Sequence, residues 1–215
     1  MLKFEDGNNW FNERINGVRR AYIIPKGVGG IAVDIGANVG AFSYVNHKVF
    51  DKIISIEPAK ETYDKCVKNT SDFENVSVYR YAVSNKSGEI IKLFPFINGN
   101  VSGNATTLKG DITAKHYDFD TYEEVETISL EDIYKTFNID KINYLKIDCE
   151  GGEYGFLINC DLSNIDYIAI EIHLHLGDDK MKELRRLIEK THNEINSIGN
   201  GIKTHFEITY KNKKL

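Results

Sequence analysis

The sequence predicts an α/β domain in which a doubly wound, mainly parallel β-sheet carries helices on both faces. Two observations lead to this fold class. Short, continuously apolar runs recur along the chain, each followed by a stretch with helical spacing, as expected for parallel strands buried on both faces. The first run, residues 31–35, ends in a glycine-rich turn before a helix, which is where doubly wound sheets bind ligands. The 215 residues suit one domain, so we expect a single unit over residues 1–215.

The N-terminal half contains the first predicted strands of this sheet. Residues 1–29 form a lead-in, with a short helix near residues 9–18 and a strand at 21–24. From residue 31 onward, apolar strands alternate with helical stretches. We predict strands at 31–35, 52–57 and 76–83, and helices at 40–50 and 59–69.

The next segment, residues 88–127, differs in character. It is polar and turn-rich at 98–111, with an exposed strand predicted at 88–96 and a returning strand at 126–130, so we expect an inserted β-hairpin that contacts the substrate. A capping box, Ser129 followed by Asp132, begins a helix over 129–137. The remaining pattern predicts strands at 144–148 and 167–173, helices at 153–159 and 178–195, and a final edge strand at 204–210.

Composition and charge restrict the classes of function. A net charge of -5 gives no general attraction to nucleic acid, so we do not expect a nucleic-acid partner. No apolar run approaches the roughly 20 residues of a membrane span, and the N-terminus lacks the apolar core of a secretory signal. The three cysteines have no metal-binding spacing and favour a reducing compartment, so we expect a cytoplasmic protein.

The turn after the first strand, from Asp34 to Gly40, is a candidate binding site. Gly36 and Gly40 permit a tight turn and the close approach of a ligand. Asn38 stands where a dinucleotide-binding GxGxxG motif needs glycine, and no P-loop lysine follows. The carboxylate of Asp34 would repel a pyrophosphate but favours the ammonium and sulfonium groups of S-adenosylmethionine. Glu57 ends the second strand, where an acid suits hydrogen bonding to both ribose hydroxyls.

Three acids follow the strand at 144–148, namely Asp148, Glu150 and Glu153. This strand should lie beside the first one, so its end faces the same crevice. Clustered carboxylates need a compensating cation, and the cofactor's positive head, a metal ion, Lys146 and a helix N-terminus are all candidates. A simpler alternative is that the acids only decorate the N-terminus of the next helix.

Polar residues also end the strand at 167–173, where Glu171 and His173 share one face. A histidine near its ordinary pKa can accept a hydroxyl proton, and a structural histidine is the alternative; His175 should lie beyond the strand. Asp148 and Glu171 together offer adjacent carboxylates able to hold Mg²⁺, so a metal ion stays an open possibility.

Several of these segments together resemble one family. Taken in order, VDIGANVGAFS, IISIEP, YAVSNKSG, TISLEDI, YLKIDCEGGEY and IAIEIH resemble the FkbM-type, S-adenosylmethionine-dependent methyltransferases over roughly residues 31–173. The resemblance implies a Rossmann-like class I methyltransferase fold closed by an antiparallel last strand. It also implies transfer of methyl to a hydroxyl, often of a sugar in a glycan or glycoconjugate, and a possible association with glycosyltransferases. The tail after residue 199 does not match clearly, which leaves the final strand pair of the family unsupported.

The resemblance also assigns site residues. It places Glu57 at the ribose, Ala82 and Val83 beside adenine, and Asp148 near the reactive methyl. The implied cofactor contacts are Asp34, Gly36, Ala37, Asn38, Gly40, Glu57, Ala82, Val83 and Asp148. Glu150, Glu153, Glu171 and His173 match family positions whose roles stay undecided.

These residues lead to a mechanistic hypothesis. The enzyme aligns an acceptor oxygen for in-line displacement, mostly by positioning, and His173 first, Asp148 second, removes the proton, with Glu171 completing the catalytic set. A sugar or glycan acceptor is expected to enter over residues 88–127. Hydrogen-bonding and aromatic side chains there are Asn98, Asn100, Ser102, Asn104, Thr106, Thr107, Tyr117, Phe119 and Tyr122.

Three other classes of function stay open. The same fold could methylate another nucleophile, including a nucleic-acid ribose. An NAD-dependent enzyme would have to place its pyrophosphate beside Asp34. A module that binds the cofactor without turnover, or a purely structural protein, is the third.

Overall fold

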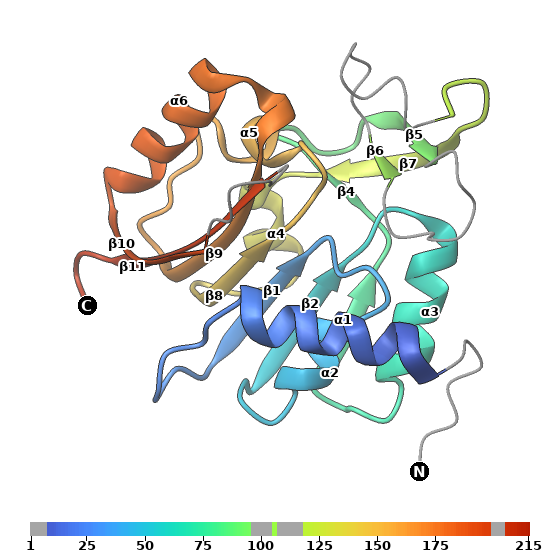
Figure 1. Cartoon of the computed structure of the whole chain (residues 1–215), viewed down its shortest axis with the longest axis horizontal. Coiled ribbons are helices and arrows are strands. Elements are labelled where there is room, and N and C mark those ends of the chain that lie inside the picture. The colour runs from blue at the N-terminus through green and yellow to red at the C-terminus, as the bar shows by residue number, and fades with distance from the viewer. Residues whose placement is uncertain (1–7, 96–104, 107–117, 199–204) are drawn as a thin grey trace.

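The main sheet has the predicted doubly wound order. The computed structural model describes residues 8–95, 105–106, 118–198 and 205–215 (Figure 1). Its seven-stranded sheet runs β10-β11-β9-β8-β1-β2-β3. The strands are β1 (Ile31–Ile35), β2 (Lys52–Ile56), β3 (Val76–Tyr79), β8 (Ile142–Ile147), β9 (Ile165–His173), β10 (His192–Ile198) and β11 (His205–Asn212). From β9 to β3 all neighbours are parallel, and β11 is antiparallel to both β9 and β10.

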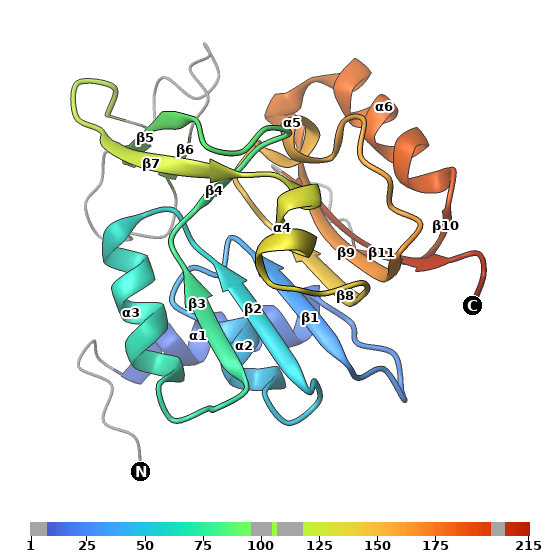
Figure 2. The ribbon, with the colours of Figure 1, turned by 180° about the vertical axis from the view of Figure 1, so that it is seen from behind.

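Helices cover both faces of this sheet, which confirms the predicted fold class. They are α1 (Asn8–Ala21), α2 (Ala41–Asn46), α3 (Lys60–Thr70), α4 (Leu130–Thr136), α5 (Glu153–Leu157) and α6 (Asp178–Glu189). Alternation along β1 divides the core, because Val33 and Ile35 pack with residues of α4, α5 and α6, whereas Ala32 packs with Phe42 of α2. Accordingly, α1 and α2 lie toward the viewer in Figure 1, and α4 does so in Figure 2.

A second, small sheet lies above the first, in the order β4-β7-β5-β6. Its strands are β4 (Ala82–Val83), β5 (Ile90–Pro95), β6 (Ala105–Thr106) and β7 (Glu123–Ile128). β5 pairs antiparallel with β7, and the returning strand, predicted at 126–130, begins at Glu123. The prediction that the first of these strands is exposed is wrong at Leu93 and Phe94, which are buried in it. Most of the polar stretch 98–111 lies outside the described residues.

The strand predicted over residues 76–83 is divided between the two sheets. β3 ends at Tyr79 and β4 begins at Ala82. Between them, the Arg80 side chain donates from Nε to the carbonyl oxygen of Pro58 (3.1 Å) and pairs through Nη2 with Glu123 Oε2 of β7 (2.6 Å). This ion pair links Arg80, at which the chain leaves the main sheet, to β7, the strand with which β4 pairs in the small sheet.

The strand predicted at residues 21–24 is absent from the structure. α1 instead continues to Ala21, and the Tyr22 N–H still donates to the carbonyl oxygen of Val18 (3.0 Å) in the helical manner. The carbonyl oxygen of Ile23 accepts a hydrogen bond from the Tyr144 hydroxyl (3.1 Å). The hydrogen bond to the Ile23 carbonyl oxygen therefore comes from a side chain, whereas the predicted strand would have received it from a neighbouring strand.

The C-terminal third differs from the prediction in two ways. The helix predicted over 178–195 ends at Glu189, and β10 begins at His192, whose buried ring donates from Nε2 to the Ile165 carbonyl oxygen (3.0 Å). The last strand is not an edge strand, because β11 lies between β9 and β10. The final strand pair, which the sequence left unsupported, is therefore present.

The predicted cap of the helix after β7 is confirmed. Ser129 caps α4, and its hydroxyl accepts from the Asp132 N–H (3.2 Å). Cys66, Cys149 and Cys160 are free thiols. Within the described part of the chain, no helix combines the length and the apolar character that crossing a membrane requires.

Candidate active site

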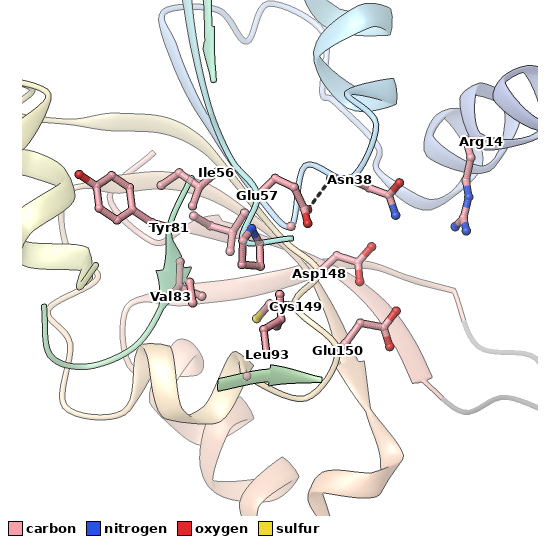
Figure 3. Close-up of a pocket in the computed structure, with 15 residues that line it drawn as sticks. Arg14, Asn38, Ile56, Glu57, Tyr81, Val83, Leu93, Asp148, Cys149 and Glu150 are labelled. Atoms are coloured by element: carbon pink, nitrogen blue, oxygen red, sulfur yellow. Dashed lines mark hydrogen bonds between the residues drawn. The ribbon is translucent and has the colours of Figure 1, made fainter. Parts of the chain in front are cut away.

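A pocket of about 710 Å³, partly open to solvent, lies at the C-terminal ends of β1, β2 and β8 (Figure 3). Parallel strands bring their carboxyl ends to one edge of a sheet, so this is where the fold collects side chains from distant parts of the sequence. The lining residues are Arg14, Ile35, Gly36, Asn38, Ile56, Glu57, Pro58, Tyr81, Ala82, Val83, Leu93, Asp148, Cys149, Glu150 and Gly152.

The turn after β1 forms the floor of the pocket and is held by its neighbours. The N–H groups of Gly36 and Ala37 both donate to the carbonyl oxygen of Ile56, each at 3.0 Å. Gly36 has a φ of 68°, and a Cβ at this position would lie 1.7 Å from the carbonyl oxygen of Asp148. Only glycine therefore allows the end of β1 to lie this close to the residue that follows β8.

Glu57 follows β2 at the middle of the pocket. Its Oε2 accepts from the Asn38 N–H (2.8 Å), and its Oε1 accepts from the Ala59 N–H (3.1 Å) and the Thr62 hydroxyl (2.8 Å). Burial raises the pKa of this carboxyl to about 7, although the three hydrogen bonds act in the opposite direction. A bound molecule with hydroxyl donors would stabilise the charged form.

The pocket has an apolar end and a polar end. Figure 3 shows Ile56, Tyr81 and Val83 on one side of Glu57, and Arg14, Asn38, Asp148 and Glu150 on the other. An aromatic base suits the first end because it can be covered by apolar surface. Charged groups of a ligand suit the second.

Asp34 does not line this pocket, contrary to the prediction that its carboxylate faces the ligand. It is fully buried, on the same face of β1 as Ala32, and its Oδ1 lies 3.1 Å from Nζ of Lys146. The Lys146 ammonium also donates to the carbonyl oxygens of Ile35 (3.0 Å) and Gly36 (2.6 Å). Asp34 is therefore linked to the turn after β1 through the Lys146 ammonium.

The acids Asp148 and Glu150, which follow β8, form what we call the polar wall of the pocket. Oδ2 of Asp148 accepts from the Tyr22 hydroxyl (3.1 Å) and lies 3.9 Å from Lys146 Nζ. The Tyr22 hydroxyl also lies 3.4 Å from Glu171 Oε2. Burial, reinforced by the negative charge of Asp148, raises the pKa of Tyr22 well above its usual value, so the phenol stays a hydrogen-bond donor.

His173, at the end of β9, is surrounded by carboxylates. Its Nδ1 lies 2.9 Å from Oε1 of the buried Glu153, and its Nε2 lies 3.4 Å from Glu150 and 3.5 Å from Glu171. Burial would lower the pKa of this imidazole, but the hydrogen bonds and charges of Glu150 and Glu153 outweigh it and raise the pKa to about 11. This raised pKa departs from the ordinary value expected from the sequence, and it favours the imidazolium over the neutral, proton-accepting form at neutral pH.

Asp148, Glu150 and His173 are also arranged so that they could share a metal ion. Each offers one ligand atom, and these atoms lie within 4.8 Å of one another. This set differs from the pair of Asp148 and Glu171 that the sequence left open as a possible Mg²⁺ site. A metal would need the neutral form of His173, so the imidazolium and a metal ion exclude each other at this place.

The structure divides the predicted site residues into two groups. Gly36, Asn38, Glu57, Ala82, Val83 and Asp148 line the pocket, whereas Asp34, Ala37 and Gly40 are not among its lining residues. Glu171 and His173 stand next to the polar wall, and His175 lies in the turn η1 (Leu174–Leu176) beyond the strand. Phe119 and Tyr122 pack on Phe94 of the small sheet. The other predicted acceptor residues, Asn98, Asn100, Ser102, Asn104, Thr107 and Tyr117, lie outside the described residues, and of Thr106 only the backbone is described.

Sequence reasoning missed the contribution of the lead-in segment. Arg14 of α1 lines the pocket, and Tyr22 contacts Asp148 from behind it. No motif surrounds either residue. The only available signal was the helical pattern of residues 9–18, which predicts a helix but not the place where it packs.

The donor set of the pocket fits S-adenosylmethionine better than a dinucleotide. Glu57 offers acceptors for ribose hydroxyls, and the acids of the polar wall suit an ammonium and a sulfonium. Arg14 is the single cationic side chain among the described lining residues, which is a poor match for a pyrophosphate.

Comparison with known proteins agrees with this chemistry. The family model "Methyltransferase FkbM domain" matches residues 34–196. A curated relative, hexuronic acid methyltransferase AglP of Haloferax volcanii, is 25% identical over 146 residues, which are 65% of this chain and 54% of the relative. The chain thus spans about half the length of that protein.

Solved structures show the same fold at low sequence identity. A fibrillarin from Methanococcus jannaschii, a pre-rRNA processing protein, superposes with a TM-score of 0.53 at 12% identity, covering 89% of this chain and 70% of that one. Fibrillarin from Aeropyrum pernix with natively bound S-adenosyl-L-methionine gives 0.52 at 10% identity, covering 92% and 74%. The architecture is that of the Rossmann-like class I methyltransferases, and the chain belongs to the FkbM methyltransferase domain family.

Proposed function

We propose that this methyltransferase transfers a methyl group from S-adenosylmethionine to a hydroxyl of a sugar in a glycan or glycoconjugate. The observation that carries the proposal is the division of the pocket, with an apolar end, the acid Glu57 in the middle and the carboxylates of Asp148 and Glu150 at the far end. The name of the curated relative, a hexuronic acid methyltransferase, supports a sugar as the acceptor. The cysteine usage supports a cytoplasmic location.

The residues of the pocket give the cofactor a direction. Tyr81, Val83 and Leu93 would cover the adenine, and Glu57 would accept from the ribose hydroxyls. Asn38 and the turn at Gly36 would hold the methionine part beside Asp148. The cofactor supplies an electrophilic methyl on a sulfonium, and the protein's task is to align an oxygen behind it.

Asp148 is the residue that we propose as the proton acceptor, in place of His173. Both of its described polar contacts, to Tyr22 and Lys146, involve Oδ2, so Oδ1 can face a bound acceptor. A bound cofactor would give its methyl to the acceptor oxygen and keep the electron pair of the broken carbon–sulfur bond on sulfur, and Asp148 would take the proton that the hydroxyl loses. The imidazolium of His173 offsets the negative charge of Glu150 and Glu171.

Binding of the cofactor is tested first, by calorimetric titration with S-adenosylhomocysteine and with NADH as comparator. We expect S-adenosylhomocysteine to bind, NADH not to bind, and Glu57→Gln to weaken the binding. Binding of NADH alone would reject the methyltransferase assignment of this pocket.

Acceptor class is tested next, by transfer of labelled methyl from S-adenosylmethionine to glycans, free sugars, RNA and protein. We expect label on a sugar, and loss of the transfer with Asp148→Asn. Mass spectrometry then locates the labelled methyl group on the sugar. Label on RNA or protein alone would contradict the proposed acceptor.

A further inference from the structure

Tyr22 connects the lead-in segment to the polar wall of the pocket. It follows α1 directly, lies outside the residues that match the family model, and has an exposed fraction of only 7%. Two contacts fix its position. Its ring packs edge-on against Phe42 of α2, with centroids 6.3 Å apart, and the next residue, Ile23, is held by the Tyr144 hydroxyl.

The Tyr22 hydroxyl ends between two carboxylates. It lies 3.1 Å from Asp148 Oδ2 and 3.4 Å from Glu171 Oε2. One hydroxyl carries one hydrogen, and the shorter distance assigns it to Asp148. A hydrogen bond to a charged acceptor in a place shielded from water is among the stronger kinds in proteins.

The Lys146 ammonium also lies close to Oδ2 of Asp148. Its Nζ lies 3.9 Å from Asp148 Oδ2 and 5.4 Å from the centre of the Tyr22 ring. The ring therefore covers the buried ammonium, in the manner of a cation–π contact. Oδ2 of Asp148 therefore accepts a hydrogen bond from Tyr22 of the lead-in segment and lies beside the Lys146 ammonium of β8.

We propose that Tyr22 is a positioning residue, which orients Asp148 so that Oδ1 faces the sulfonium and the acceptor oxygen. This inference rests on the proposed function, because Asp148 must face the cofactor for its orientation to matter. The lead-in helix α1 then belongs to the active site, although the family match begins only at Asp34.

The inference is tested by comparing the affinities for S-adenosylmethionine and S-adenosylhomocysteine in calorimetric titrations. The two differ by the methyl group and its positive charge, so a fixed carboxylate beside the sulfur raises the ratio of the two affinities. We expect Tyr22→Phe, which keeps the ring, to lower that ratio by about tenfold or more, the size of a lost hydrogen bond to a charged group. The affinity for S-adenosylhomocysteine should change little.

Two further variants separate positioning from mere packing. Tyr144→Phe removes a hydroxyl from the same aromatic cluster and loosens the anchor at Ile23, but it leaves the Tyr22–Asp148 bond in place. It should preserve the affinity ratio. Asp148→Asn should lower the ratio, and adding Tyr22→Phe to it should have no further effect, because Tyr22 acts through Asp148.

The outcomes are distinct. An unchanged ratio in Tyr22→Phe, or an equal loss of affinity for both ligands, overturns the positioning role while leaving the proposed function intact. If the wild type binds neither ligand although thermal melting shows it to be folded, the proposed function and the inference fail together.

Discussion

Lys146 and Asp34 are direct neighbours across the parallel pair of β8 and β1, and their Nζ and Oδ1 atoms lie 3.1 Å apart in the interior. Burial lowers the pKa of Lys146, but the negative charges of Asp34 and Asp148 outweigh it and raise the pKa above its ordinary value. Lys146 also donates to the carbonyl oxygens of Ile35 and Gly36. This one ammonium therefore contacts the interior of the sheet at Asp34, the turn after β1 and the pocket residue Asp148.

Replacing Lys146 by methionine should destabilise the fold strongly, because it leaves Asp34 buried without its partner. We expect the free energy of unfolding to fall by about 3–5 kcal/mol, as is usual when one member of a buried ion pair is removed. Urea denaturation measures it. Lys141→Met is the matched control, because Lys141 pairs with Asp166 at the surface (2.8 Å) and should cost less than about 1 kcal/mol. Equal effects of the two substitutions would contradict the structural importance of the buried pair.

Gly36→Ala should abolish cofactor binding, because the new Cβ would lie 1.7 Å from the carbonyl oxygen of Asp148. Gly88→Ala is the matched control. It has a similar positive φ of 75°, but its Cβ would meet nothing within 4 Å, so it bears the conformational cost alone, about 1 kcal/mol. Titration with S-adenosylhomocysteine distinguishes the two, and retained binding in Gly36→Ala would show that the ends of β1 and β8 can separate.

Glu57 should make both stability and cofactor binding depend on pH. Its pKa rises from 4.5 to about 7 on folding, so the protonated form is favoured in the folded state. The stability that this provides is complete below pH 4.5 and is lost as the pH rises to about 7 and beyond. Between these values we expect the unliganded protein to become less stable as pH increases, and Glu57→Gln to flatten this trend in urea denaturation curves.

Binding should show the opposite trend, because ribose hydroxyls donate to the charged form of Glu57. We expect the affinity for S-adenosylhomocysteine to rise between pH 6 and 8 with release of a proton, about the window set by a pKa near 7. Calorimetry in buffers of different ionisation enthalpy counts that proton. No proton release would mean that Glu57 is already charged or does not contact the ligand.

His173 should carry both ring protons at pH 8. Its raised pKa means that the ion pair stabilises the fold fully below pH 6.5 and is lost only as the pH rises through about 11. Nitrogen-15 NMR of the imidazole groups measures the charge directly. His192 is the internal control, because burial lowers its pKa, so it should be neutral in the same spectrum.

A neutral His173 would contradict this prediction and reopen the two alternatives for the site. If added Mg²⁺ then shifted the His173 signals, the set of Asp148, Glu150 and His173 would be a metal centre. If Mg²⁺ had no effect, His173 would again be the candidate base.

The sequence predicted the arrangement of the sheet better than the direction of its side chains. In the run Ile-Ala-Val-Asp-Ile, buried on both faces, every neighbour of Asp34 is apolar, so alternation does not reveal which face the carboxylate occupies. Its partner, Lys146, comes 112 positions later in the chain and is identified only by the register of β1 with β8. Glu57 was predictable because it follows a strand and precedes Pro58, at the sheet edge itself.

The parts that escaped prediction depend on tertiary contacts. Helical spacing extends past Glu189 in the sequence, but pairing with β11 takes residues 192–198 into the sheet. The charge of His173 depends on Glu150 and Glu153, which belong to another turn, and the role of Tyr22 depends on where α1 packs. Local patterns carry no record of such contacts.

The position of β11 inside the sheet has a consequence for synthesis on the ribosome. β10 is made first, but its described pairing is with β11 alone, which in turn fills the space beside β9. Until residues 205–212 have left the exit tunnel, β9 keeps an open flank, and that flank is a template for pairing with other nascent chains. The sheet is therefore complete only after residues 205–212 have emerged, and until then pairing of β9 with another chain competes with its pairing to β11.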